Sequence, residues 1–138
     1  MREILFRGKI KGSGEWVEGN LATVKWWLDG SPITVIIPKD AYLDPRSGAG
    51  TIRYIEVDPE TVGQWTGLVD RYDQKIFEDD ILKCTYDLYP TCRVIFNEYC
   101  ASFQSLEDDG FSDFFLSTIS PAKMKVIGNI HDSPELLT

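Results

Sequence analysis

The chain has few cysteines, and they form no pattern that could build a disulfide or metal framework. Its three cysteines are an odd number, lie eight residues apart and include no CxxC pair: Cys84, Cys92 and Cys100. A disulfide scaffold needs paired cysteines, and structural zinc sites need closely spaced cysteine and histidine ligands. We therefore expect free thiols on strands, which fits a reducing compartment, and we expect no metal and no cofactor.

The chain also lacks a long apolar segment. Its longest apolar runs are about five residues, whereas a membrane-spanning helix needs roughly 20. Residues 1–11 (MREILFRGKIK) are too short and too charged for the apolar region of a signal peptide. We expect no membrane partner and a cytoplasmic location.

Histidine is nearly absent, and no catalytic set surrounds the one that is present. His131 precedes Asp132, but no serine stands in a GxSxG elbow that such a pair could activate. An enzyme that uses paired carboxylates is an alternative, although nothing in the spacing brings two of them together. We therefore expect no catalytic residue and no enzyme, and we expect His131 to lie at the surface or to cap a helical turn.

Two glycine-rich stretches resemble phosphate-binding loops in composition alone. They are residues 12–14 (Gly-Ser-Gly) and residues 48–50 (Gly-Ala-Gly). Neither stretch precedes a β-α-β unit or carries the lysine and serine of a P-loop. Both are predicted to be turns, and no residue is assigned to cofactor binding.

Positive charge is scarce in the second half of the chain. The net charge is −8, and residues 57–138 hold 15 acidic against 6 basic residues, whereas residues 1–56 hold 7 against 8. An acidic surface repels phosphate backbones, so direct nucleic-acid binding is not expected. The same charge favours a basic protein partner. It also leaves open a nucleic-acid mimic that occupies a host DNA-binding protein.

Strand-forming residues and turns dominate what is present. Aromatic residues make up 12% of the chain, and glycine and proline recur throughout. Short strands separated by turns every eight to twelve residues or so are typical of all-β proteins. We predict a mainly β fold of short antiparallel strands with few helical turns. Residues 1–56 would form a β-meander lobe and residues 57–138 a small SH3-like barrel, and the two lobes could pack as one domain.

Period-two alternation and turn residues mark the individual strands. The first lobe is predicted to contain strands at residues 3–10, 15–19, 21–28, 33–37 and 52–57. In the second lobe the clearest strands are predicted at residues 81–86, 92–96, 99–103 and 123–130. Residues 58–61 form either a turn or one helical turn, residues 104–114 an acidic loop, and residues 114–119 either a strand or a helical turn.

Several segments, in order along the whole chain, carry a family resemblance. They are residues 2–8 (REILFRG), 14–19 (GEWVEG), 36–38 (IIP), 57–68 (VDPETVGQWTGL), 75–81 (KIFEDDI) and 126–137 (VIGNIHDSPELL). In these segments the chain resembles the YopX family of phage and prophage proteins. The resemblance implies a β-rich fold with an SH3-like barrel, a bacterial host, and self-assembly into an oligomer. It implies no established activity and carries over no catalytic residue.

The chain departs from the family pattern at two turns. The acidic corner usually reads acid-Gly-Asp, and here Asp79 replaces the glycine between Glu78 and Asp80. In the preceding connection, Asp73 and Gln74 stand where a glycine is usual. Aspartate tolerates a left-handed backbone, so both turns can survive. The three acidic residues of the corner could hold a divalent cation only if further carboxylates, such as Glu107, Asp108, Asp109 or Asp113, folded beside them, and otherwise form a solvated turn.

Adjacent tryptophans are the most promising candidate site. If residues 21–28 form a strand, Trp26 and Trp27 lie on opposite faces, one in the core and one exposed. An exposed indole is a strong interface anchor, so these two residues are the candidate interface, whereas Trp16 and Trp65 are expected to pack in the core or a turn. We therefore expect a non-enzymatic, oligomeric protein-interaction module whose partners are further copies of itself and a basic host or phage protein.

Overall fold

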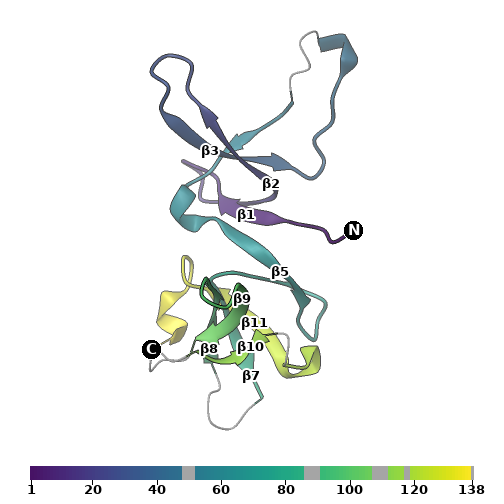
Figure 1. Ribbon diagram of the computed structural model, residues 1–138, viewed down its shortest axis with the longest axis vertical. Coiled ribbons are helices and arrows are strands. Elements are labelled where there is room, and N and C mark those ends of the chain that lie inside the picture. Colours follow the sequence, from purple (N-terminus) through teal and green to yellow (C-terminus); the bar gives the residue numbers. More distant parts are fainter. Residues whose placement is uncertain (48–51, 86–90, 107–111, 117–118, 138) are drawn as a thin grey trace. The chain divides into compact units, whose positions relative to one another are not determined.

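The computed structural model describes residues 1–47, 52–85, 91–106, 112–116 and 119–137. The chain separates into two compact units, Met1–Gln64 and Trp65–Thr138 (Figure 1). Both units consist of antiparallel sheets with short 3-10 turns, so the predicted mainly β class is confirmed. No helix among the described residues has the length and apolar character needed to cross a bilayer.

The first unit is built on an antiparallel sheet with the strand order β4-β3-β2-β1-β5 (Figure 1). Its strands are β1 (Phe6–Lys9), β2 (Trp16–Lys25), β3 (Pro32–Pro38), β4 (Ile55–Glu56) and the start of β5 (Gly63–Val69). The strands predicted at residues 15–19 and 21–28 are thus one strand, and it ends at Lys25. The strand predicted at residues 52–57 is reduced to the two residues of β4.

Two glycines permit the close packing of the first unit's small core. Its fully buried side chains are Leu5, Val35, Ile36 and Val57. A β-carbon on Gly8 would lie 3.1 Å from the Val57 β-carbon, and one on Gly19 would collide with the carbonyl oxygen of Ile37 on the neighbouring strand. The backbone of β2 therefore approaches β3 at Gly19 more closely than any other residue would allow.

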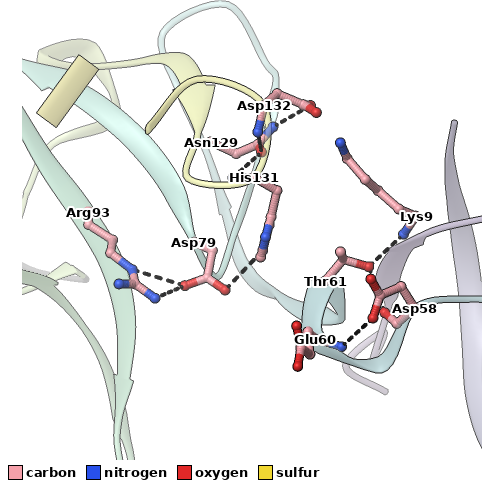
Figure 2. Close-up of polar contacts among 9 residues, drawn as sticks. All are labelled: Lys9, Asp58, Glu60, Thr61, Asp79, Arg93, Asn129, His131 and Asp132. Carbon is pink, nitrogen blue, oxygen red and sulfur yellow. Dashed lines mark hydrogen bonds and ion pairs between the residues drawn. The ribbon is translucent and has the colours of Figure 1, made fainter. Parts of the chain in front are cut away.

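The segment after β4 forms one helical turn, which is one of the two forms predicted for residues 58–61. The 3-10 turn η2 (Pro59–Thr61) has Asp58 as its N-cap, and the Asp58 side chain accepts a hydrogen bond from the Glu60 N–H at 3.1 Å (Figure 2). The Thr61 hydroxyl accepts a hydrogen bond from the Lys9 N–H at 2.8 Å, which ties the turn to β1. A second turn, η1 (Pro45–Ser47), follows β3.

The second unit has a five-stranded antiparallel sheet with the order β10-β9-β8-β7-β11. Its strands are β7 (Asp80–Cys84), β8 (Thr91–Asn97), β9 (Ser102–Leu106), β10 (Ser112–Phe115) and β11 (Met124–Asn129), and β6 (Lys75–Phe77) pairs with the later residues of β5. The predicted SH3-like barrel is not confirmed, because the described strand pairs leave this sheet open at β10 and β11.

Strand pairing corrects two loop predictions in the second unit. β9 and β10 occupy both ends of the acidic loop predicted at residues 104–114, and residues 114–115 belong to the strand β10, which is one of the two forms predicted for the segment that begins at residue 114. The turn between β8 and β9 is longer than predicted, because the Asn97 side chain accepts hydrogen bonds from the Tyr99 and Cys100 N–H groups and Ala101 is left-handed, with φ 49°. The 3-10 turns η4 (Pro121–Lys123) and η5 (Pro134–Leu137) flank β11.

Aliphatic and sulfur-containing side chains form the core of the second unit. Its buried members are Ile76, Leu82, Cys84, Cys92, Val94, Leu116, Ile119 and Met124. The sulfur atoms of Cys84 and Cys92 lie 3.8 Å apart, and the two residues are thiols rather than a disulfide. Cys100 is also a thiol but is exposed, on the turn between β8 and β9.

A buried carboxylate organises the connection between β5 and β6. Asp70 is only 2% exposed. Its Oδ1 accepts hydrogen bonds from the N–H groups of Tyr72 at 2.8 Å and Gln74 at 3.0 Å, and its Oδ2 accepts one from Val126 at 2.9 Å. Burial raises the pKa of Asp70, but these three N–H donors outweigh burial and hold the pKa below its usual value. One side chain thus fixes a turn and joins it to β11.

Two aspartates occupy left-handed backbone positions, as predicted for the two turns that depart from the family pattern. Asp73 has φ 60° and Asp79 has φ 67°. We expect glycine at either position to give a protein more stable than the alanine variant by about 1 kcal/mol, because a β-carbon is disfavoured there. Urea unfolding of the four variants measures this difference. Equal stability of the alanine and glycine variants would contradict the assigned backbone.

Candidate functional site

The turn between β2 and β3 projects a short, well-ordered tip from the first unit. The Trp26 N–H donates to the Ser31 carbonyl at 2.7 Å, and the Gly30 N–H donates to the Trp26 carbonyl at 2.8 Å. Gly30 is left-handed, with φ 72°, as suits a turn between the strands predicted at residues 21–28 and 33–37. The Asp29 carboxylate accepts a hydrogen bond from the Ser31 N–H at 2.9 Å, and this donor lowers the pKa of Asp29.

Apolar side chains cover this hairpin and are open to solvent. Trp27 is 80% exposed and Leu28 65%, and Trp26 and Val24 are each 41% exposed. The prediction that the two tryptophans lie on opposite faces of a strand is wrong. The strand ends at Lys25, both indoles belong to the turn, and neither is in the core. We call this turn, residues 26–31, the hairpin tip.

A surface hollow lies beside β2 in the same unit. It has a volume of about 290 Å³ and is lined by Glu3, Ile4, Leu5, Gly19, Asn20 and Lys39. Leu5 forms its buried apolar part, whereas Ile4 is half exposed. Lys39 and Glu3 form an ion pair at 3.4 Å at its rim. A hollow that combines a buried leucine with polar side chains is suited to pack against a side chain of a protein partner.

The acidic corner is held by internal contacts. Asp80 is 1% exposed, and its carboxylate accepts a hydrogen bond from the Phe77 N–H at 2.8 Å. The Asp79 Oδ1 accepts hydrogen bonds from the Arg93 Nε at 3.1 Å and Nη2 at 2.7 Å. Among the described residues, no three histidine, cysteine, aspartate or glutamate side chains gather to hold a metal ion. Residues 107–109 lie outside the described residues, and only the backbone of Asp113 is described.

His131 is part of the same cluster. Its side chain is 17% exposed, and its Nε2 lies 3.5 Å from the Asp79 Oδ2, so the carboxylate sits between a guanidinium and an imidazole (Figure 2). The backbone around His131 is fixed by Asn129, whose Oδ1 accepts the His131 and Asp132 N–H groups at 3.0 Å. His131 is therefore half-buried, not at the surface as expected. It anchors the segment after β11 to the acidic corner.

The remaining sequence candidates have structural roles. The Arg7 guanidinium lies over the Trp16 ring at 4.7 Å, and the Trp65 indole N–H donates to the Leu68 carbonyl at 2.8 Å. Residues 12–14 form the predicted turn, with Gly12 and Gly14 both left-handed. Residues 48–50 lie outside the described residues.

Sequence reasoning missed three features. Arg93 gave no signal because its partner, Asp79, lies 14 residues away, in the turn between β6 and β7. The buried Asp70 looked like part of a polar connection. The hollow beside β2 depends on residues from three separate segments, so no local pattern could reveal it.

The fold is that of a mainly β protein with two units. Its most exposed indole, that of Trp27, lies on the hairpin tip. The family model described as YopX protein matches residues 5–138. The chain therefore belongs to the YopX protein family.

The chain is similar over its whole length to a solved structure, the crystal structure of protein EF1440 from Enterococcus faecalis. It is 26% identical, has a TM-score of 0.60, and the match covers 100% of each chain. Curated proteins gave no significant match.

Proposed function

We propose that this protein is a non-enzymatic, self-associating interaction module, a phage or prophage accessory protein that acts in the bacterial cytoplasm. The observation that carries the proposal is the solvent-exposed hairpin tip with Trp26, Trp27 and Leu28. Water-exposed tryptophan and leucine on an ordered turn are costly for a monomer, and tryptophan is the residue most enriched at the energetic centres of protein interfaces. The tip is thus suited to be a contact between copies.

The second unit supplies the charge for a different partner. It holds 13 acidic and 6 basic residues. Surface charge of one sign speeds association with a partner of the opposite sign and disfavours nucleic acid. We therefore assign self-association to the first unit and the binding of a basic host or phage protein to the second unit.

Removal of the most exposed indole tests the proposal. We expect the wild-type protein to form an oligomer, and Trp27→Ser to weaken its association about 30-fold, since loss of a tryptophan hot spot costs about 2 kcal/mol. Light scattering over a range of concentrations measures both.

Tyr99→Ser is the matched control, because Tyr99 is an aromatic residue in the second unit that is even more exposed than Trp27. This variant should associate like the wild type. A wild-type protein that stays monomeric at high micromolar concentration would overturn the proposed function.

A further inference from the structure

The outer edge of β2 has hydrogen-bonding groups that no described strand pairs. β1 pairs with β2 only from Trp16 to Gly19, so residues 21–25 have β3 on one side and, among the described residues, no strand on the other. In Figure 1 the N-terminus and the hairpin tip lie on opposite sides of the first unit, so the chain before β1 does not follow this part of β2.

The hydrogen bonds of the hairpin show which groups face outward. The Trp26 N–H donates to the Ser31 carbonyl, so these two residues form a hydrogen-bonded pair. Because such pairs alternate along antiparallel strands, Val24 and Ala22 bond to β3, while Leu21, Thr23 and Lys25 direct their N–H and C=O groups away from it. The Val57 N–H donates to the Thr34 carbonyl on the far side of β3. Thr34 therefore directs its carbonyl away from β2, as expected if Thr23 and Thr34 are a pair without hydrogen bonds between them.

This edge is complementary to itself. Suppose that β2 pairs antiparallel with β2 of a second copy, with Thr23 at the centre. Each Thr23 then faces the partner's Thr23, and Leu21 faces the partner's Lys25. On the other face, Ala22 lies opposite the partner's Val24, a small residue against a larger one. Threonine pairs are favourable across antiparallel strands, and a twofold axis through the Thr23 pair makes every other contact occur twice.

The same register brings the hairpin tip to the hollow. When Thr23 meets the partner's Thr23, Trp26 reaches the level of the partner's Asn20 and Trp27 the level of the partner's Gly19. Asn20 and Gly19 both line the hollow. The hollow has a volume of about 290 Å³ and lies at this level, so each hairpin tip is placed to cover it.

We propose that two copies of this chain join through the outer edges of β2, residues 21–25, in an antiparallel arrangement centred on Thr23, with each hairpin tip over the other copy's hollow. The inference rests on the proposed self-association, and it specifies which surfaces of the two copies meet and in which register. Strand addition supplies backbone hydrogen bonds, and the indoles supply buried apolar area.

Site-directed cross-linking tests the register, in a Cys100→Ser background that removes the exposed thiol. In the proposed pairing the two Thr23 α-carbons lie about 5.5 Å apart, within the disulfide range of about 4.4–6.8 Å. Thr23→Cys should therefore form a dimer-linking disulfide under mild oxidation. Lys25→Cys is the control on the same face and edge. Its two copies would be about 14 Å apart and should not cross-link.

A second variant covers the case in which strain prevents the disulfide. Thr23→Pro removes an outward N–H without touching the bonds to β3, so it should keep the wild-type circular dichroism and shift the oligomer to smaller mass in sedimentation. If the wild type is an oligomer but Thr23→Pro associates normally and Thr23→Cys links no faster than Lys25→Cys, the register is wrong while self-association stands. A monomeric wild type overturns both.

Discussion

Gly19→Ala is expected to destabilise the first unit by at least about 3 kcal/mol, the upper range for overpacking. A β-carbon at this position would collide with the Ile37 carbonyl oxygen and lie 2.7 Å from its carbon and 2.9 Å from a methyl carbon of Ile36. The first two of these atoms belong to the paired backbone, which cannot rotate away as a side chain can. The strands β2 and β3 must therefore separate, and amide exchange in both should accelerate.

Gly8→Ala is the comparison that isolates the backbone effect. Its β-carbon would meet side-chain atoms only, at 3.1 Å from Val57 and 3.3 Å from Ile36. These side chains can shift by a few tenths of an ångström, so we expect a loss of about 1 kcal/mol. Urea unfolding and amide exchange of both variants provide the measurement. A Gly19→Ala protein as stable as Gly8→Ala would show that the two strands are not packed as closely as described.

Asp70→Ala is expected to cost about 3–5 kcal/mol. It would leave three partly buried backbone N–H groups without their acceptor, and each such group costs about 1–3 kcal/mol. The N–H groups are those of Tyr72, Gln74 and Val126. Their exchange with solvent deuterium should rise from protected to fast. Asp44→Asn, at an exposed carboxylate that pairs with Arg46, should change stability little.

The pH dependence of stability follows from the same carboxylate. The pKa of Asp70 is lower in the folded protein than in the unfolded chain. The contribution of Asp70 is therefore fully present above the unfolded pKa, near 4, and is lost as the pH falls through the folded pKa. Unfolding free energies measured from pH 7 down to pH 2.5 should fall less steeply for Asp70→Asn than for the wild type. Parallel slopes would contradict this role.

The sequence revealed the fold class because strands and turns have local signatures. Alternation marked β1, β-branched residues marked β3, the Asp29-Gly30 pair marked the hairpin turn, and residues 58–61 were compatible with one helical turn. The closure of the sheet was not predictable in this way. Whether β10 and β11 meet depends on contacts between distant segments, and a strand's own pattern does not specify its neighbour.

The candidate site was predictable in identity but not in geometry. The chemistry of tryptophan singled out Trp26 and Trp27. The alternation of residues 21–28, however, predicted a strand that continues to residue 28, whereas the turn begins at Trp26. The chain turns there, where the Gly30 N–H donates to the Trp26 carbonyl, and the side-chain pattern of residues 21–28 does not reveal this turn. The open edge at Thr23 was invisible for a different reason, because an unpaired strand edge shows only once the extent of β1 is known.

The two inward sulfur atoms of the second unit make its internal motions measurable without any engineered probe. Cys92 is opposite Leu82 rather than Cys84, so the cysteine α-carbons are offset along the strands and the sulfurs meet without a geometry that favours a bond between them. A thiol reagent should modify Cys100 at once and the two core cysteines only during transient opening. The rate of the slow phase of labelling then reports how often this sheet opens locally.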